Sequence, residues 1–87
     1  MPFYVYILKS LKDGTYYKGS TEDYLKRLEY HNQGLSIYTS RKIPWQMIYV
    51  EAHPDKRSML IREKKLKKGK GEYFEWLVKQ ATNILHN

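Results

Sequence analysis

The N-terminal segment Phe3–Gly19, with the sequence FYVYILKSLKDGTYYKG, decides the fold. Its residues up to Leu8 are apolar and rich in aromatic and β-branched types, which is typical of a strand buried on both faces. The Asp-Gly pair at positions 13 and 14 tolerates the positive φ angles of a tight hairpin, and Thr15–Gly19 is then the return strand. Because side chains alternate along a strand, such a hairpin places Tyr6 and Tyr17 on the same face of the sheet.

A helix is predicted over Thr21–Asn32. Ser20 or Thr21 is its expected N-cap, because a hydroxyl can accept a hydrogen bond from a free backbone N–H of the first turn. Acidic residues follow directly, where the helix dipole favours negative charge. Leu25 and Leu28 are expected to face the core, and the Asn-Gln-Gly sequence at positions 32–34 is expected to end the helix.

The rest of the chain adds one strand and two helices. Leu35–Pro44 has no clear period and is interpreted as a basic loop. Aromatic and branched residues predict a strand over Trp45–Val50, and the spacing of apolar residues predicts helices over Lys56–Lys68 and Glu72–Leu85. The expected apolar stripe of the last helix consists of Tyr73, Trp76 or Leu77, Ala81 and Ile84.

This order of elements, ββαβαα, predicts an α/β fold in which a three-stranded, mainly antiparallel sheet is flanked by helices. A chain of 87 residues can build one modest core but not two, so residues 1–87 are expected to form a single domain. Trp45 and Trp76 are expected in that core.

The composition favours a polyanionic partner. The 16 Lys and Arg residues outnumber the 9 Asp and Glu residues, and the formal net charge of +7 suits DNA, RNA or anionic lipid. Nucleic-acid contacts are expected from Arg41, Lys42, Lys64, Lys67 and Lys68. The absence of cysteine excludes disulfides, thiol catalysis and cysteine-ligated metals. No apolar run approaches the ~20 residues that span a bilayer and no basic signal region opens the chain, so the predicted location is the cytoplasm, with no membrane partner.

Several side chains could together hydrolyse a phosphodiester. That reaction needs an activated nucleophile and a way to neutralise the charge that grows on the phosphate oxygens. A tyrosine hydroxyl, with an ordinary pKa of about 10, acts as a base only where nearby cations stabilise the phenolate. Arg27 would be such a cation if its helix packs over Tyr6 and Tyr17. His31, one turn further along, can move protons near neutral pH.

Glu63 is the acidic residue in a basic stretch of its helix. It could form a local ion pair, or it could hold Mg²⁺, which often takes only one or two protein carboxylates. Taken singly, such residues are more often structural, because tyrosines mostly pack and exposed ion pairs are weak. Only the joint pattern of Tyr6, Tyr17, Arg27, His31 and Glu63 indicates a nuclease.

The order of these motifs resembles that of the GIY-YIG nuclease superfamily, in particular its small standalone bacterial members. The matching segments are Tyr4–Leu8, Tyr17–Thr21, Arg27-Leu28 with His31-Asn32, Pro44-Trp45 and Arg62–Lys68. They cover nearly the whole chain in the family's order, and the series is far more specific than any one of its motifs.

The resemblance implies a role for each candidate residue. Tyr17 would be the general base that acts on a water nucleophile, and Tyr6 would help to orient that water. Arg27 would contact the scissile phosphate, and His31 would assist it. Glu63 would bind the divalent metal, Mg²⁺ or Mn²⁺.

The chain departs from the family pattern in two places. Tyr4 stands where the first motif has glycine, and Lys18 stands where the second has isoleucine. Lys18 is expected to face away from Tyr17, so its ammonium group must reach solvent or a partner. No counterpart of the family's late asparagine is identified.

The favoured function is a divalent-metal-dependent DNA endonuclease. Branched or flapped DNA recognised by shape is the expected substrate, and sequence specificity would require a targeting protein partner. The alternative is a catalytically weak nucleic-acid-binding module within a larger repair or recombination complex. A third interpretation is a protein-interaction domain that uses the exposed face of the last helix. Binding by charge alone requires neither Tyr17 nor Glu63, which favours the enzyme.

Overall fold

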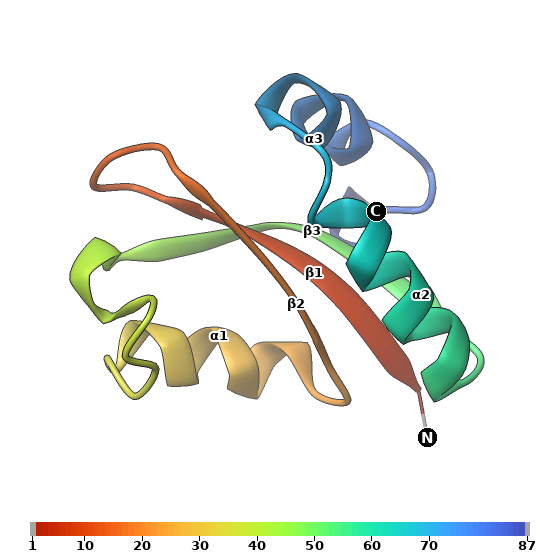
Figure 1. Ribbon diagram of the computed structural model, residues 1–87, viewed down its shortest axis with the longest axis horizontal. Coiled ribbons are helices and arrows are strands. Elements are labelled where there is room, and N and C mark those ends of the chain that lie inside the picture. Colours follow the sequence, from red (N-terminus) through yellow and green to blue (C-terminus); the bar gives the residue numbers. More distant parts are fainter. Residues whose placement is uncertain (1, 87) are drawn as a thin grey trace.

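Three strands form one antiparallel sheet at the centre of the molecule (Figure 1). The computed structural model describes the backbone of residues 2–86 and the side chains of residues 2–85. In it, β1 (Phe3–Ser10) lies between β2 (Tyr16–Thr21) and β3 (Trp45–His53) and pairs antiparallel with both. The predicted α/β class, the three-stranded sheet and the order ββαβαα are confirmed.

The β1–β2 hairpin has the arrangement that the sequence predicted. Tyr17 lies opposite Leu8 and Gly19 lies opposite Tyr6, so the two tyrosines share a face. Their ring centroids are 6.4 Å apart. Gly14 takes a φ angle of 78° in the turn, a conformation that glycine adopts without steric cost.

Gly19 allows the Tyr6 ring to lie directly against β2. A Cβ atom at position 19 would be 2.5 Å from the Tyr6 hydroxyl oxygen and 2.7 Å from its Cζ atom. Contacts this short do not occur between non-bonded atoms in packed interiors, so a side chain here would have to displace the ring. The position of the Tyr6 hydroxyl therefore depends on the absence of a side chain at position 19.

Helix α1 (Tyr24–Asn32) begins later than predicted. Thr21 still belongs to β2, where it pairs with Tyr4, so it cannot serve as the cap. The N-cap is Asp23, whose side chain accepts a hydrogen bond of 3.1 Å from the Lys26 backbone N–H. The prediction of an N-cap at position 20 or 21 was wrong because the strand continues through both positions.

The last two helices are separated by a short turn. Helix α2 (Lys56–Leu66) begins where predicted and ends slightly early, at Leu66. Helix α3 (Gly71–Val78) is shorter than predicted, since the chain turns after Val78 and ends in a 3₁₀ turn over Ile84–His86. The prediction of a continuous helix to Leu85 was wrong.

Asn83 explains why α3 stops. Its side chain is buried, and its Oδ1 accepts from the Val50 backbone N–H at 3.2 Å. Its Nδ2 donates to the carbonyl oxygens of Ile48, at 3.1 Å, and Val78, at 3.0 Å. The amide thus joins β3 to the end of α3, and these bonds favour the turn after Val78 over a continued helix.

The buried side of α3 also differs from the prediction. Phe74 and Leu77 are buried, whereas Tyr73 is 37% and Trp76 56% exposed. The expected stripe was wrong at Tyr73 and Trp76, which are exposed neighbours of the packing residues, whereas its alternative member Leu77 is confirmed. Trp45 lies in the core, as expected, at 3% exposure.

Helices cover both faces of the sheet, with α1 and α3 on opposite sides (Figure 1). The face under α2 and α3 is an apolar cluster that includes Val5, Ile7 and Leu66. The face under α1 is also packed, but it contains the Tyr6 ring. Leu28 packs there as predicted, whereas Leu25 is 68% exposed, so its core assignment was wrong.

Candidate active site

A buried chain of hydrogen bonds connects β1, α1 and the loop that follows α1. The Tyr6 hydroxyl oxygen lies 3.0 Å from His31 Nε2, and His31 Nδ1 lies 2.8 Å from Thr39 Oγ1. The Trp45 indole N–H donates to the Thr39 carbonyl oxygen at 3.0 Å. All four residues are buried. The imidazole is therefore held at both nitrogens, which fixes its orientation.

Burial determines the charge states of this network. It raises the pKa of Tyr6 above its ordinary value, with a further contribution from Tyr17. Burial lowers the pKa of His31, and the Arg27 guanidinium acts in the same direction. At neutral pH Tyr6 is protonated and His31 is neutral. Either Tyr6 donates to Nε2 while Nδ1–H donates to Thr39, or both hydrogen bonds run in the reverse direction.

Tyr17 lies beside this network and faces a cavity. Its ring centroid is 5.0 Å from that of His31 and 5.7 Å from that of Tyr38. Tyr17 is half-buried, and together with Lys18, Tyr38 and Lys67 it lines a cavity of about 390 Å³. Of the two motif tyrosines, Tyr17 is accessible to water or substrate, and Tyr6 is enclosed.

Arg27 lies on α1 one turn before His31. Its guanidinium carbon is 5.0 Å from the centroid of the Tyr30 ring, a cation–π arrangement that fixes the head group. Its charge acts on both Tyr6 and His31, as their pKa shifts record. Arg27 also lines a separate hollow of about 460 Å³ along the start of α1. The guanidinium thus lies near the tyrosines while it remains open to an anion.

Glu63 extends from α2 toward the same region. Its Oε2 is 3.0 Å from Lys67 Nζ, and its side chain is 16% exposed against 57% for Lys67. Glu63 raises the pKa of Lys67, and Tyr17 contributes to that shift as well. After burial and the Tyr17 charge, Glu63 is also among the groups that raise the pKa of Tyr6. The fold therefore brings Tyr6, Tyr17 and His31 into contact, and the charges of Arg27 on α1 and Glu63 on α2 act on Tyr6.

A single carboxylate is available for a metal ion at this place. In the described part of the chain, no group of three or more His, Asp or Glu side chains is arranged around one metal position. Mg²⁺ commonly binds through one or two carboxylates and completes its shell with water and substrate phosphate, so Glu63 alone fits that ion. Lys67 would have to release the Glu63 oxygen that it now contacts.

Comparison with known proteins identifies the family. The model of the GIY-YIG catalytic domain matches residues 2–75. The chain belongs to the GIY-YIG family. Every residue predicted for the catalytic set lies inside the matched region.

Relatives of this GIY-YIG domain are small bacterial proteins. A UPF0213 protein of Bacillus cereus is 41% identical over 68 residues, which cover 72% of this chain and 71% of that protein. A UPF0213 protein of Staphylococcus saprophyticus is 40% identical over 65 residues, covering 74% of this chain and 78% of the other. The solution NMR structure of a UPF0213 protein from Bacillus halodurans matches with a TM-score of 0.57 and 31% identity, over 99% of this chain and 92% of that one.

Membership of the GIY-YIG family confirms the resemblance found in the sequence and implies nuclease activity. The names of the relatives add no substrate or metal. Of the helices described in residues 2–86, none has the length and apolar character needed to cross a membrane.

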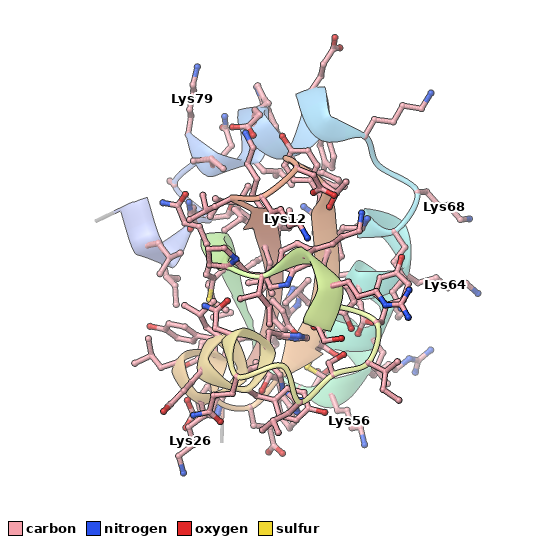
Figure 2. The ribbon with its side chains drawn as sticks, turned by 90° about the vertical axis from the view of Figure 1, so that its left-hand side faces the viewer. Lys12, Lys26, Lys56, Lys64, Lys68 and Lys79 are labelled. Carbon is pink, nitrogen blue, oxygen red and sulfur yellow. The ribbon has the colours of Figure 1, made fainter. Side chains whose placement is uncertain are left out.

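The predicted nucleic-acid-binding residues of this GIY-YIG domain differ in their surroundings. Lys67 lines the cavity beside Tyr17. Lys42 pairs with Asp13 at 2.9 Å on the surface, and Arg41 is exposed. Lys64 and Lys68 extend outward from α2 and the turn after it (Figure 2). Of these predicted residues, Lys67 therefore contacts the candidate site directly.

Three further residues of the GIY-YIG site were not found in the sequence. Thr39 and Tyr38 come from the segment interpreted as a featureless basic loop, yet one binds His31 and the other lines the cavity. Lys18 extends along Phe74, with Nζ 5.3 Å from the ring centroid, and still reaches the cavity beside Tyr17. The sequence signal that could have indicated Tyr38 and Thr39 as site residues was an aromatic residue next to a hydroxyl residue in a loop that also contains Arg41 and Lys42.

Proposed function

We propose that this protein is a divalent-metal-dependent endonuclease that hydrolyses phosphodiester bonds in DNA with a water activated by Tyr17. The observation that supports this function is the convergence of an accessible tyrosine, Tyr17, a buried Tyr6–His31 pair and the Arg27 guanidinium. A surface that bound DNA through charge alone would need no buried tyrosine–histidine pair.

The two tyrosines have different tasks in this mechanism. Tyr17 faces the cavity, which Lys67 also lines, and accepts the proton of the attacking water. Tyr6 is protonated, enclosed and bonded to His31, so it is suited to fix the His31 ring beside Tyr17 and thereby to help orient that water, rather than to remove its proton. Arg27 neutralises charge on the phosphate oxygens as the new bond forms.

Glu63 would hold Mg²⁺ or Mn²⁺ in this proposal. When bound, the ion would polarise a phosphate oxygen and stabilise the leaving alkoxide. Departure of Lys67 from Glu63 would leave its ammonium group free to contact the DNA backbone. The Glu63 carboxylate and the cavity that its ion-pair partner Lys67 lines support this assignment.

The preferred substrate is DNA recognised by its branched or flapped shape. The exposed lysines of α2 are suited to phosphates, which position a protein without reading sequence. A targeting protein partner would supply any specific location. The alternative is a weakly catalytic binding module within a repair or recombination complex. It would use the same surface but would require neither Tyr17 nor Glu63.

A panel of labelled duplex, flap, fork and four-way-junction DNA, incubated with Mg²⁺ or Mn²⁺, tests the proposal. The wild type is expected to cleave branched substrates. Glu63→Gln should reduce cleavage below detection while gel-shift affinity for the same DNA persists, because the amide keeps the shape of the side chain and loses its charge.

Glu72→Gln is the matched control, since Glu72 is an exposed acid on α3, and its cleavage rate should equal that of the wild type. Full activity of Glu63→Gln would remove the metal role from Glu63. Tight binding of every substrate without cleavage by the wild type would favour the binding module.

A further inference from the structure

The cavity beside Tyr17 has two chemically different walls. Tyr17 and Tyr38 contribute aromatic rings, and Lys18 and Lys67 contribute ammonium groups. Its volume of about 390 Å³ is within the range of about 300–1,000 Å³ that is usual for small-ligand sites. An occupant that fits both walls carries a flat ring and a negative charge.

The two lysines line one cavity, and Lys18 is not neutralised by a carboxylate in the part of the chain that the structure describes. Lys18 makes no ion pair among the described residues, and its pKa is lowered by burial and by the charge of Lys67. Lys67 pairs with Glu63, the carboxylate assigned to the metal. Two like charges at one cavity repel each other, and an anion between them would remove that repulsion.

Tyr38 supplies the ring that is open to solvent. It is 77% exposed although its ring centroid is only 5.7 Å from that of Tyr17. An aromatic residue held at the edge of a site with one face uncovered is suited to stack on a nucleobase, since every base has a π-face. In a duplex the π-face of each base is already covered by the neighbouring base pairs, so the base that stacks on Tyr38 must be unpaired.

We propose that this cavity binds one unpaired nucleotide of the DNA strand next to the scissile phosphate, with its phosphate between Lys18 and Lys67 and its base stacked on Tyr38. This inference rests on the proposed nuclease function and specifies its substrate. Unpaired nucleotides occur at flaps and forks, so the subsite would select DNA by strand separation.

Fluorescence of 2-aminopurine tests the stacking contact without relying on cleavage. Flap DNA carries the probe at the first unpaired position next to the junction, and a second DNA carries it one base pair inside the duplex. In the presence of EDTA, the full-length protein should quench the unpaired probe and leave the paired probe unchanged. Tyr38→Ala should abolish the quenching and weaken flap binding on the order of tenfold, whereas Tyr38→Phe should preserve both.

Trp76→Leu is the matched control, because Trp76 is an exposed aromatic residue on α3 outside the cavity. It should leave the quenching intact. Equal quenching by wild type and Tyr38→Ala, or equal quenching of paired and unpaired probes, would overturn the subsite. A protein that quenches through Tyr38 but cleaves nothing keeps the subsite and loses the proposed enzyme function, so the two failures are distinguishable.

The phosphate contact has a separate readout. For single-stranded DNA, log K falls with log salt, so the slope is negative. The Lys18→Met and Lys67→Met double variant should make this slope less negative by about 0.7, the value of one phosphate contact. Lys79→Met, at the C-cap of α3 and not among the residues that line the cavity, should leave the slope unchanged. An unchanged slope in the double variant would refute the contact.

Discussion

Two polar clusters of similar composition are found at different places in this protein. One is the candidate site with Tyr6, Tyr17, Arg27, His31 and Glu63. The other, the Glu51 cluster, consists of Tyr49, Glu51, His53 and Arg62. Both combine tyrosine, histidine, glutamate and arginine, so residue types alone do not distinguish them.

The Glu51 cluster is saturated by its own hydrogen bonds. Glu51 accepts from the Tyr49 hydroxyl at 2.5 Å and lies 2.6 Å from His53 Nε2. The Arg62 Nε–H donates to both Glu51 oxygens, at 3.3 and 3.1 Å. Burial alone would raise the pKa of Glu51, but these partners bring it below the ordinary value. The cluster is therefore a structural link between β3 and α2.

The candidate site leaves part of its chemistry unused. Only the Tyr6–His31–Thr39 chain is closed, whereas Tyr17 faces a cavity and Arg27 is held through a ring face rather than by a carboxylate. We therefore propose the candidate site as the functional cluster, because its groups still have capacity for a ligand. Three substitutions test that distinction.

The largest effect is expected from Tyr17→Phe. Loss of the hydroxyl removes the proposed base from a ring whose packing is retained, so single-turnover cleavage should fall on the order of 10²-fold or more while DNA binding changes little. Tyr49→Phe is the matched change in the Glu51 cluster. It should cost about 1 kcal/mol of stability through its lost hydrogen bonds to Glu51 and Thr82, but cleave at the wild-type rate.

Equal rates for Tyr17→Phe and wild type would eliminate the Tyr17 mechanism. A larger loss in Tyr6→Phe than in Tyr17→Phe would instead assign the base to the buried Tyr6–His31 pair.

A smaller effect, on stability rather than rate, is expected from Glu51→Gln. The change leaves the half-buried Arg62 without its carboxylate and should lower the free energy of unfolding by about 2 kcal/mol in urea titrations. Glu63→Gln should cost at most ~1 kcal/mol, because its ion-pair partner Lys67 is largely exposed. Similar losses in both variants would contradict the division into a structural and a functional cluster.

The smallest effect concerns pH. Because the pKa of His31 is lowered in the folded protein, the unfolded chain binds more protons just below the ordinary histidine pKa of about 6.5. Stability from His31 is therefore present above that pH and declines as the pH falls toward the folded pKa. Unfolding free energies at pH 7 and 5.5 should differ less in His31→Gln than in the wild type. Identical differences would show that burial of His31 is not linked to protonation.

The sequence was sufficient for the hairpin, since strand alternation and the Asp-Gly turn are local features that fix the positions of Tyr6 and Tyr17. It was not sufficient for the boundaries of α1 and α3. The first depends on pairing of Thr21 with Tyr4, and the second on bonds from Asn83 to a distant strand. Long-range contacts of this kind have no periodic signature.

The site shows the same limit. Arg27 and His31 could be placed together because helical spacing puts residues four apart on one face. Thr39 and Tyr38 could not, because their positions depend on how the loop returns over α1. The exposed Leu25 was misjudged for a related reason: its face of α1 turns away from the sheet, which only packing reveals.

The contact between Gly19 and the Tyr6 ring has a consequence for engineered libraries of this domain. Because a methyl group at position 19 would collide with Cζ as well as with the hydroxyl, replacing Tyr6 by phenylalanine does not make room for alanine there. Effects of substitutions at the two positions will be strongly non-additive, and the best residue at one will depend on the other. Gly19 and Tyr6 should therefore be varied together. In a library that varies them independently, most members will have a displaced ring at position 6.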